Sequence, residues 1–128
     1  SLKRCVIEGA NALSDASDLH LEDSFVLGHN ALSGPAFDSH MHSRNAGRNI
    51  TIVNSVVYGH NAIDRVKSGT IKNSIIGGYA PLSDAAIESI RNTYIVSRDG
   101  VIYVEDGQLG NTGRLPHSSR RSLRHGNY

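Results

Sequence analysis

The apolar residues of this chain recur in a phrase that is repeated along most of its length. Two copies follow each other closely: residues 52–59 read IVNSVVYG, and residues 71–78 read IKNSIIGG. The small residue in the middle of each copy, called the anchor below, has counterparts in further copies. The anchors are Cys5, Ser24, Ser55, Ser74 and Thr93. Successive anchors lie 19, 31, 19 and 19 residues apart, and a phrase that recurs at a fixed spacing is typical of a repeat architecture.

Three columns of the aligned repeats are apolar, and they predict short strands. These are the residues three before the anchor, two after it and eight after it. The columns are Leu2, Leu21, Ile52, Ile71 and Ile90; Ile7, Val26, Val57, Ile76 and Ile95; and Leu13, Leu32, Ile63, Leu82 and Val101. β-Branched residues dominate and the spacing is not helical, so strands are favoured over helices. The three columns are the predicted core.

Two other columns are polar or small. The residue before the anchor is polar in every copy and is Asn at positions 54, 73 and 92. If like residues stack on like, these side chains form a ladder of amide hydrogen bonds. Gly follows four residues after the anchor in most copies, as at Gly28 and Gly59, which predicts a turn or a close approach between backbones.

The columns predict an all-β fold, specifically a β-solenoid of parallel β-helix-like coils of about 19 residues. Each coil would stack on the preceding one at the strand spacing of about 4.8 Å. Several coils must stack, because one coil cannot bury its own apolar side. We expect residues 1–104 to form the solenoid, with an inserted loop near residues 33–49.

The end of the chain departs from the repeat. Residues 94–96 and 101–104 are expected to pair as antiparallel strands across a turn at Asp99–Gly100, because Asp-Gly is a strong hairpin signal. Asp106–Gly107 is then expected to turn out of the sheet. Residues 105–128 are predicted to be a solvated C-terminal tail, and the alternative is a segment that orders against a neighbouring subunit or contacts an anionic partner.

Composition and charge narrow the classes of partner. The chain has 128 residues and a formal net charge of +1, so we expect one domain and no nucleic-acid partner. It contains no recognisable signal peptide and no apolar run long enough to cross a bilayer, so no membrane insertion is expected. Cys5 occupies an anchor and is interpreted as a small buried side chain; a reactive thiol or an intermolecular disulfide is the alternative.

The inserted loop carries a candidate metal site. It holds His40 and His42, which would lie on one side of a strand and bind Zn²⁺ if a third ligand such as His29 or Asp38 converged on them. The alternative is an exposed polar loop that packs its apolar residues, Phe37 and Met41, onto the repeats.

A second candidate site is the column that directly follows the recurring glycines of the repeat. It contains His29, His60, Tyr79 and Arg98, with Asn30 and Asn61 beside the histidines. In stacked coils these residues would line one edge. One interpretation is a turn column that tolerates any polar residue. The other is a strip that binds glycan, in which Tyr79 offers a ring face and the polar side chains offer hydrogen bonds.

Residues 24–31 (SFVLGHNA) and 55–62 (SVVYGHNA) resemble the repeats of trimeric phage tail spikes and tail fibres. They are also similar to the head repeats of trimeric autotransporter adhesins, but that repeat is shorter, so the phage proteins fit the spacing better. The resemblance covers roughly residues 2–104. It implies a homotrimer of β-solenoids, located in the virion tail or outside the cell, that binds or cleaves bacterial surface polysaccharide.

The start of the chain carries one further expectation from this resemblance. Some such proteins end in a module that drives trimer assembly and is later cut off, with Ser as the first residue released. Ser1 is compatible with that cleavage point, and the start of an expressed fragment is the alternative. Because the chain begins in mid-phrase, an upstream domain of the same polypeptide is expected to cap the open coil.

Three hypotheses follow. The leading one is a C-terminal module that trimerises a phage tail spike or fibre and promotes its folding, with a structural and not a catalytic role. The second is a carbohydrate-binding module for bacterial surface polysaccharide. The third is an enzyme fragment or a self-cleaving module. No Gly-x-Ser-x-Gly elbow or other nucleophile motif occurs, so no catalytic residue and no cofactor are predicted.

Overall fold

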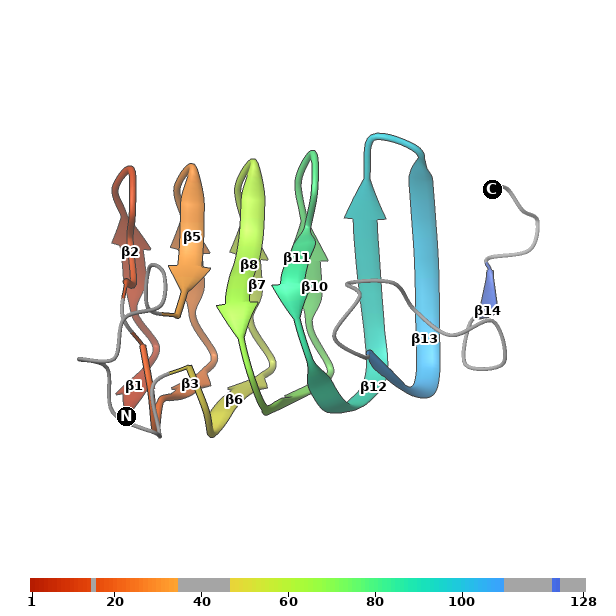
Figure 1. Ribbon diagram of the computed structural model, residues 1–128, viewed down its shortest axis with the longest axis horizontal. Helices are drawn as coiled ribbons and strands as arrows, with labels where there is room; N and C mark the ends of the chain where they lie inside the picture. The colour runs from red at the N-terminus through yellow and green to blue at the C-terminus, as the bar shows by residue number, and fades with distance from the viewer. Residues whose placement is uncertain (15, 35–46, 110–120, 123–128) are drawn as a thin grey trace.

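The computed structural model describes residues 1–14, 16–34, 47–109 and 121–122. In this part of the chain the fold is all-β and no helix occurs, which confirms the predicted class. The strands lie side by side in chain order along the long axis of the molecule, so each repeat occupies its own position along that axis (Figure 1). Within the described ranges, no helix is long and apolar enough to span a membrane.

The strands of successive repeats form three rows. The first row contains β1 (Leu2–Lys3), β3 (His20–Glu22), β6 (Ile50–Val53) and β9 (Gly69–Lys72). The second row contains β2 (Val6–Glu8), β4 (Phe25–Leu27), β7 (Val56–Tyr58) and β10 (Ile75–Gly77). The third row contains β5 (Asn30–Ser33), β8 (Asn61–Val66) and β11 (Leu82–Ala85). Since β12 (Ile87–Ser97) pairs with both β9 and β10, it joins the first two rows into one curled sheet.

The repeat period sets the register of these rows. Pairing within the rows is parallel, and each residue lies opposite its equivalent in the next repeat. In the first row, Ile52 lies between Leu21 and Ile71. Parallel strands in register place identical columns above one another, so a chain with a 19-residue spacing stacks apolar on apolar.

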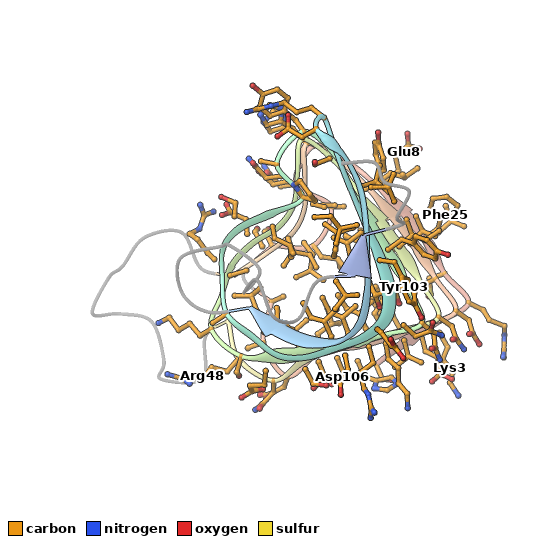
Figure 2. All side chains as sticks on the ribbon, turned by 90° about the vertical axis from the view of Figure 1, so that its right-hand side faces the viewer. Lys3, Glu8, Phe25, Arg48, Tyr103 and Asp106 are labelled. Atoms are coloured by element: carbon orange, nitrogen blue, oxygen red, sulfur yellow. The ribbon has the colours of Figure 1, made fainter. Side chains whose placement is uncertain are left out.

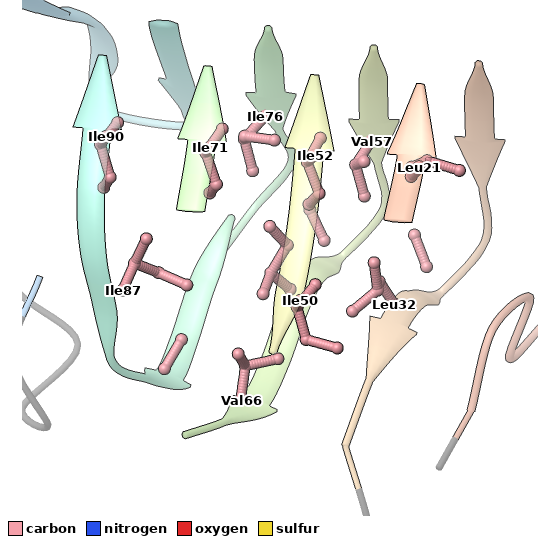
Figure 3. Packing of buried hydrophobic residues seen from close by; sticks show 14 of the residues in the cluster. Leu21, Leu32, Ile50, Ile52, Val57, Val66, Ile71, Ile76, Ile87 and Ile90 are labelled. Carbon is pink, nitrogen blue, oxygen red and sulfur yellow. The ribbon is translucent and has the colours of Figure 1, made fainter. Parts of the chain in front are cut away.

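The predicted apolar columns form the core, as Figure 3 shows. The first column is buried at Leu21, Ile52, Ile71 and Ile90, and the second at Val26, Val57, Ile76 and Ile95. The third column is present in Leu13, Leu32, Ile63 and Leu82, which lie opposite one another in turn. Val101 was predicted to be the fifth member of this column, and that prediction is wrong, because Val101 pairs with Val96 in the closing hairpin.

The glycine column marks a close approach between backbones. A Cβ built on Gly59 would lie 1.8 Å from the carbonyl oxygen of Gly28, and one on Gly78 would lie 1.6 Å from that of Gly59. No side chain fits at either separation. Of the two predicted explanations, the structure therefore supports close approach, with the carbonyl of one repeat filling the space that a Cβ of the next would need.

The residue before the anchor has a backbone conformation that the sequence did not reveal. Its φ is positive in all five repeats, at Arg4 (52°), Asp23 (51°), Asn54 (50°), Asn73 (53°) and Asn92 (50°). Among non-glycine residues, Asn and Asp adopt this left-handed conformation most readily. The predicted amide ladder is present where Asn92 Nδ2 donates to Asn73 Oδ1 at 2.7 Å, and Asn54 Nδ2 donates to Asp23 Oδ1 at 3.2 Å.

The antiparallel hairpin predicted near the end is confirmed, but it is longer than expected. β13 (Gly100–Leu109) pairs with β12, and Val104 lies opposite Thr93 and is buried. The predicted exit from the sheet at Asp106–Gly107 is wrong, because these residues still pair with Arg91 and Ile90. The strand therefore continues past residue 104, where the tail was expected to begin, and β14 (Arg121–Ser122) pairs with β13 in turn.

Both ends of the inserted loop are held by the rows. The backbone N–H of Gly34 donates to the carbonyl of Asp64 at 2.9 Å, and that of Gly47 donates to the carbonyl of Ala16 at 3.1 Å. The N–H of Lys67 donates in turn to the carbonyl of Gly47 at 2.7 Å. Residues 35–46 lie outside the described residues, but the segments that flank them keep the repeat register.

Candidate functional site

The predicted column of His29, His60, Tyr79 and Arg98 comes together as a continuous stack at one edge. The rings of His29 and His60 are parallel, with centroids 4.8 Å apart and an interplanar angle of 4°. The rings of His60 and Tyr79 are 4.7 Å apart with an angle of 5°. The guanidinium carbon of Arg98 lies 4.3 Å from the centroid of the Tyr79 ring. We call these four residues the corner stack, because they follow the tight glycine turn after the second row.

The corner stack changes how this edge can bind a ligand. Both faces of the Tyr79 ring are occupied, one by His60 and the other by Arg98. The expectation that Tyr79 offers a ring face to a sugar is therefore wrong in this arrangement. The edges of the stack remain exposed, since Tyr79 has 51% of its surface accessible. These edges carry imidazole nitrogens, a phenol hydroxyl and guanidinium N–H groups, which are hydrogen-bonding groups.

An amide ladder accompanies the corner stack. The side chain of Asn61 donates from Nδ2 to Asn30 Oδ1 at 3.0 Å, and Asn30 donates to Asn11 Oδ1 at 2.9 Å. The predicted site residues Asn30 and Asn61 thus lie beside their histidines, as the column spacing implied. Their hydrogen bonds stabilise the stacking of repeats, and their role in ligand binding stays a prediction.

The remaining predicted site residues are His40, His42 and Ser1. His40 and His42 lie outside the described residues. Across the described ranges, no group of three or more His, Cys, Asp or Glu side chains is placed to hold a metal ion. Ser1, the proposed cleavage point, is exposed and directly precedes β1.

The structure also reveals an apolar surface that the sequence reasoning missed. The residue directly after each anchor lies in the second row and points outward, away from the core. We call this column the outer apolar face; its members are Val6, Phe25, Val56, Ile75 and Tyr94. Among the described residues, Tyr79 of the corner stack is one of the exposed large apolar side chains, and the others lie on the second row or its continuation in β12: Val6, Phe25, Tyr58, Ile75 and Tyr94. The outward positions of the first row are mostly polar, for example His20, Thr51 and Lys72.

A signal for this face was available in the aligned repeats. The position after the anchor is apolar in every copy. Because successive side chains of a strand point to opposite faces, a buried residue two after the anchor requires an outward residue one after it. An outward column that is apolar throughout is not needed for the core of one chain, and exposed apolar patches of this kind are typical of interaction surfaces.

A shallow open groove of about 380 Å³ borders the outer apolar face. One side is lined by the amides of Asn54, Asn73 and Asn92, and the other by Val56, Ile75 and Tyr94. The ring of Tyr94 also contacts that of Tyr103 on β13, with centroids 5.0 Å apart. The apolar surface is thus continuous from β10 across β12 to the closing strand.

The two rims of the outer apolar face carry charge. In the view along the molecule, Phe25 lies on one side of the section, between Glu8 at one corner and Lys3 at the other (Figure 2). Lys3 and its neighbour Arg4 are exposed, and so is Glu8. We call the corner with Arg4 the first-row rim and the corner with Glu8 the third-row rim. In the first repeat the first-row rim is therefore basic and the third-row rim is acidic.

Comparison of the chain with known proteins found no match to any family model, to any curated protein or to any solved structure.

Proposed function

We propose that this chain is a β-solenoid whose copies associate through the outer apolar face, and that it serves as the C-terminal trimerisation and folding module of a phage tail spike or tail fibre. The single observation that carries the proposal is the outer apolar face. Five outward apolar side chains contribute nothing to the core of a monomer, whereas an assembly would remove them from water. Burial of apolar surface is the main favourable term in protein association.

The solenoid class is supported by the register of the rows. Each repeat contributes one strand to the first row and one to the second, and the equivalent residues of successive repeats lie opposite one another. Such a rod presents the same columns along its whole length. It therefore suits a structural role in an elongated, extracellular or virion-tail assembly that joins an upstream domain of the same polypeptide.

The test is the mass of the protein in solution, measured by light scattering, with a parallel gel in SDS at room temperature. The proposal predicts a species of about three times the chain mass of 13.8 kDa. A variant with Ile75→Ser and Tyr94→Ser removes two adjacent members of the face, those of the fourth and fifth repeats, and is expected to shift the mass toward the monomer. Lys72→Ser, on the polar first row, is the control. A folded wild-type monomer at high protein concentration contradicts the trimerisation role.

A second candidate function, carbohydrate binding, is favoured by the corner stack. A row of exposed donors and acceptors spaced 4.7–4.8 Å apart along the rod fits the hydroxyl groups of an extended polysaccharide. Because the ring faces are covered, binding would use the ring edges and the Arg98 guanidinium. The test is binding to a glycan array and to bacterial cells. Loss of binding is expected for Arg98→Ala together with Tyr79→Phe, and unchanged binding by that variant removes this function.

A further inference from the structure

Resting on the proposed carbohydrate binding, we infer that Tyr58 is the stacking platform of that site. Its ring holds the C–H face of an uncharged pyranose, and the edges of the corner stack bind the hydroxyl groups of the same polysaccharide. The ligand is thus a polysaccharide that contains neutral hexoses. Three observations carry this inference: the position of the Tyr58 ring over Gly77, the apolar surroundings of the ring and its place beside the corner stack.

The position of the Tyr58 ring explains the burial of Gly77, its partner in the second row. Since Ile76 is fully buried and successive residues of a strand point to opposite faces, position 77 faces outward. Gly77 is nevertheless buried. A Cβ built on Gly77 would lie 2.9 Å from Cδ2 and 3.0 Å from Cε2 of Tyr58. The tyrosine ring therefore lies over the glycine and covers it.

A ring in this position has one side toward the sheet and the other toward solvent. Tyr58 has 49% of its surface accessible although its ring covers Gly77. Tyr79, by contrast, has both ring faces occupied, and the ring of Tyr94 packs against that of Tyr103. An accessible ring that rests on the sheet offers a rigid apolar contact area at low cost in side-chain entropy. Stacking of a sugar ring requires such an area.

The residues around Tyr58 determine which sugars fit. Its neighbours on the outward side of the second row are apolar or Gly: Leu27 and Gly77 in its own column, and Val56 and Ile75 in the adjacent column. An acidic sugar stacked here would place its carboxylate beside apolar side chains, where it loses hydration. An uncharged pyranose presents C–H groups on one face and hydroxyl groups at its edge, so it matches an apolar platform with polar groups beside it.

The polar groups lie at the corner next to the platform. Tyr58 is two residues before His60, so their Cα atoms are at most about 7 Å apart, and His60 stacks on Tyr79. The column of Tyr58 also contains Glu8, which lies at the third-row corner of the section in Figure 2. Tyr58 therefore lies on the third-row rim and is not a member of the outer apolar face. A sugar on its ring can direct hydroxyl groups to the ring edges of His60 and Tyr79.

The first test removes the ring and restores it. Binding of the wild-type protein to a printed array of bacterial surface polysaccharides identifies the polysaccharide with the strongest signal, on which the variants are then measured. Tyr58→Ala is expected to weaken binding at least about tenfold, and Tyr58→Phe is expected to stay within about threefold of the wild type, because stacking uses the ring face and not the hydroxyl. Lys72→Ser, at an exposed residue of the polar first row, is the control and is expected to bind as the wild type does.

The second test moves the ring and keeps its chemistry. Gly77 is not one of the glycines with a positive φ, so Ala suits its backbone, but the new Cβ would displace the Tyr58 side chain. Gly77→Ala is therefore expected to weaken binding about threefold or more. Gly9→Ala, whose Cβ would meet no atom closer than 3.9 Å, is the matched control. Circular dichroism melting and light scattering of each variant check that the fold and the mass are unchanged.

The outcomes separate this inference from the proposed carbohydrate binding. If the wild type binds no polysaccharide on the array, carbohydrate binding fails and the inference fails with it. If the variant with Arg98→Ala and Tyr79→Phe loses binding but Tyr58→Ala keeps it, the platform is wrong while carbohydrate binding stands. Weaker binding by Tyr58→Ala and Gly77→Ala, with binding retained by Tyr58→Phe, supports the inference.

Three further results would overturn the platform. Equal losses for Tyr58→Ala and Tyr58→Phe would show that the residue acts through its hydroxyl. A lower mass in solution for Tyr58→Ala would place the residue in the contact between copies. Binding only to polymers in which every sugar is acidic would contradict the ligand class.

Discussion

The hydroxyl of Ser74 accepts a hydrogen bond from the backbone N–H of Ser55 at 3.1 Å. The same oxygen donates to the carbonyl of Lys72 at 2.9 Å. One small side chain therefore joins two successive repeats and closes a turn in its own repeat. The same contact recurs in earlier repeats: the backbone N–H of Ser24 donates to the hydroxyl of Ser55 at 3.1 Å, and that of Cys5 donates to the hydroxyl of Ser24 at 3.0 Å. This ladder explains why the anchor is small and has both a donor and an acceptor.

Ser74→Ala is expected to lower the free energy of unfolding by about 1–3 kcal/mol, because it leaves the N–H of Ser55 without its partner inside the protein. Ser55 and Ser74 are only 4% exposed, so water does not readily replace the hydroxyl. The measurement is the midpoint of urea unfolding. Ser74→Thr is the control, since Thr93 already performs the same role in the next repeat, where its hydroxyl accepts from Ser74 N at 3.3 Å. Equal stability of the two variants would show that the ladder contributes nothing.

Gly59→Ala is expected to destabilise the chain by at least about 3 kcal/mol, because the new Cβ would collide with a backbone carbonyl that cannot move without shifting its row. The matched control is Gly9→Ala in the same column. The nearest atom to a Cβ at Gly9 is 3.9 Å away, in contrast to 1.8 Å at Gly59. Thermal unfolding of the pair is the measurement. If the Gly59→Ala protein unfolded at the same temperature as the Gly9→Ala protein, the close approach of the backbones would be contradicted.

Substitutions of Asn73 test the left-handed backbone conformation of the residue before the anchor. Replacement by Val is expected to cost more than replacement by Gly, by about 1–2 kcal/mol, because a β-branched residue is strained at a φ of 53° and Gly is not. Both substitutions remove the amide that accepts from Asn92, so their difference isolates the backbone conformation. Chemical denaturation of the two variants provides the comparison. A more stable Val variant would show that the backbone at residue 73 adopts another conformation.

Substitutions of Ile75 and Ile76 test association and folding separately. Ile76 is fully buried between Val57 and Ile95, so Ile76→Ala is expected to lower the free energy of unfolding by about 2–5 kcal/mol. Ile75, its neighbour on β10, is 42% exposed on the outer apolar face. Ile75→Ala is expected to change stability little when the protein is dilute and to weaken association when it is concentrated. Unfolding measured at two protein concentrations tests both expectations, and the reverse ranking would place the wrong residue in the core.

Much of the fold follows from the spacing of residues alone. The 19-residue interval between anchors such as Ser55 and Ser74 predicted which residues lie opposite each other, and the pairing of Ile52 with Ile71 confirms it. This prediction succeeds because parallel strands stack at one fixed spacing, so a period in the sequence becomes a register in space. The hairpin at Asp99–Gly100 was also predictable, since its turn signal is local.

The prediction was incomplete where the outcome depends on neighbouring repeats or on strand length. The rings of His60 and Tyr79 were expected to share an edge, but their parallel stacking, which covers the ring faces, depends on the distance between repeats. Val101 kept the apolar spacing yet lies in an antiparallel strand, because β12 continues without the turn that would lead the chain into the third row.

The sequence by itself determined the strand class, the period, the core columns and the residues that gather at the corner stack, since each follows from the order of residues and the alternation of strands. Only the tertiary structure decided the positive φ before each anchor, the contact of Gly59 with the carbonyl of Gly28, and the parallel stacking of the His60 and Tyr79 rings. These features depend on distances between segments 19 or 31 residues apart. Such distances exist only once hydrogen bonds between repeats hold the rows together.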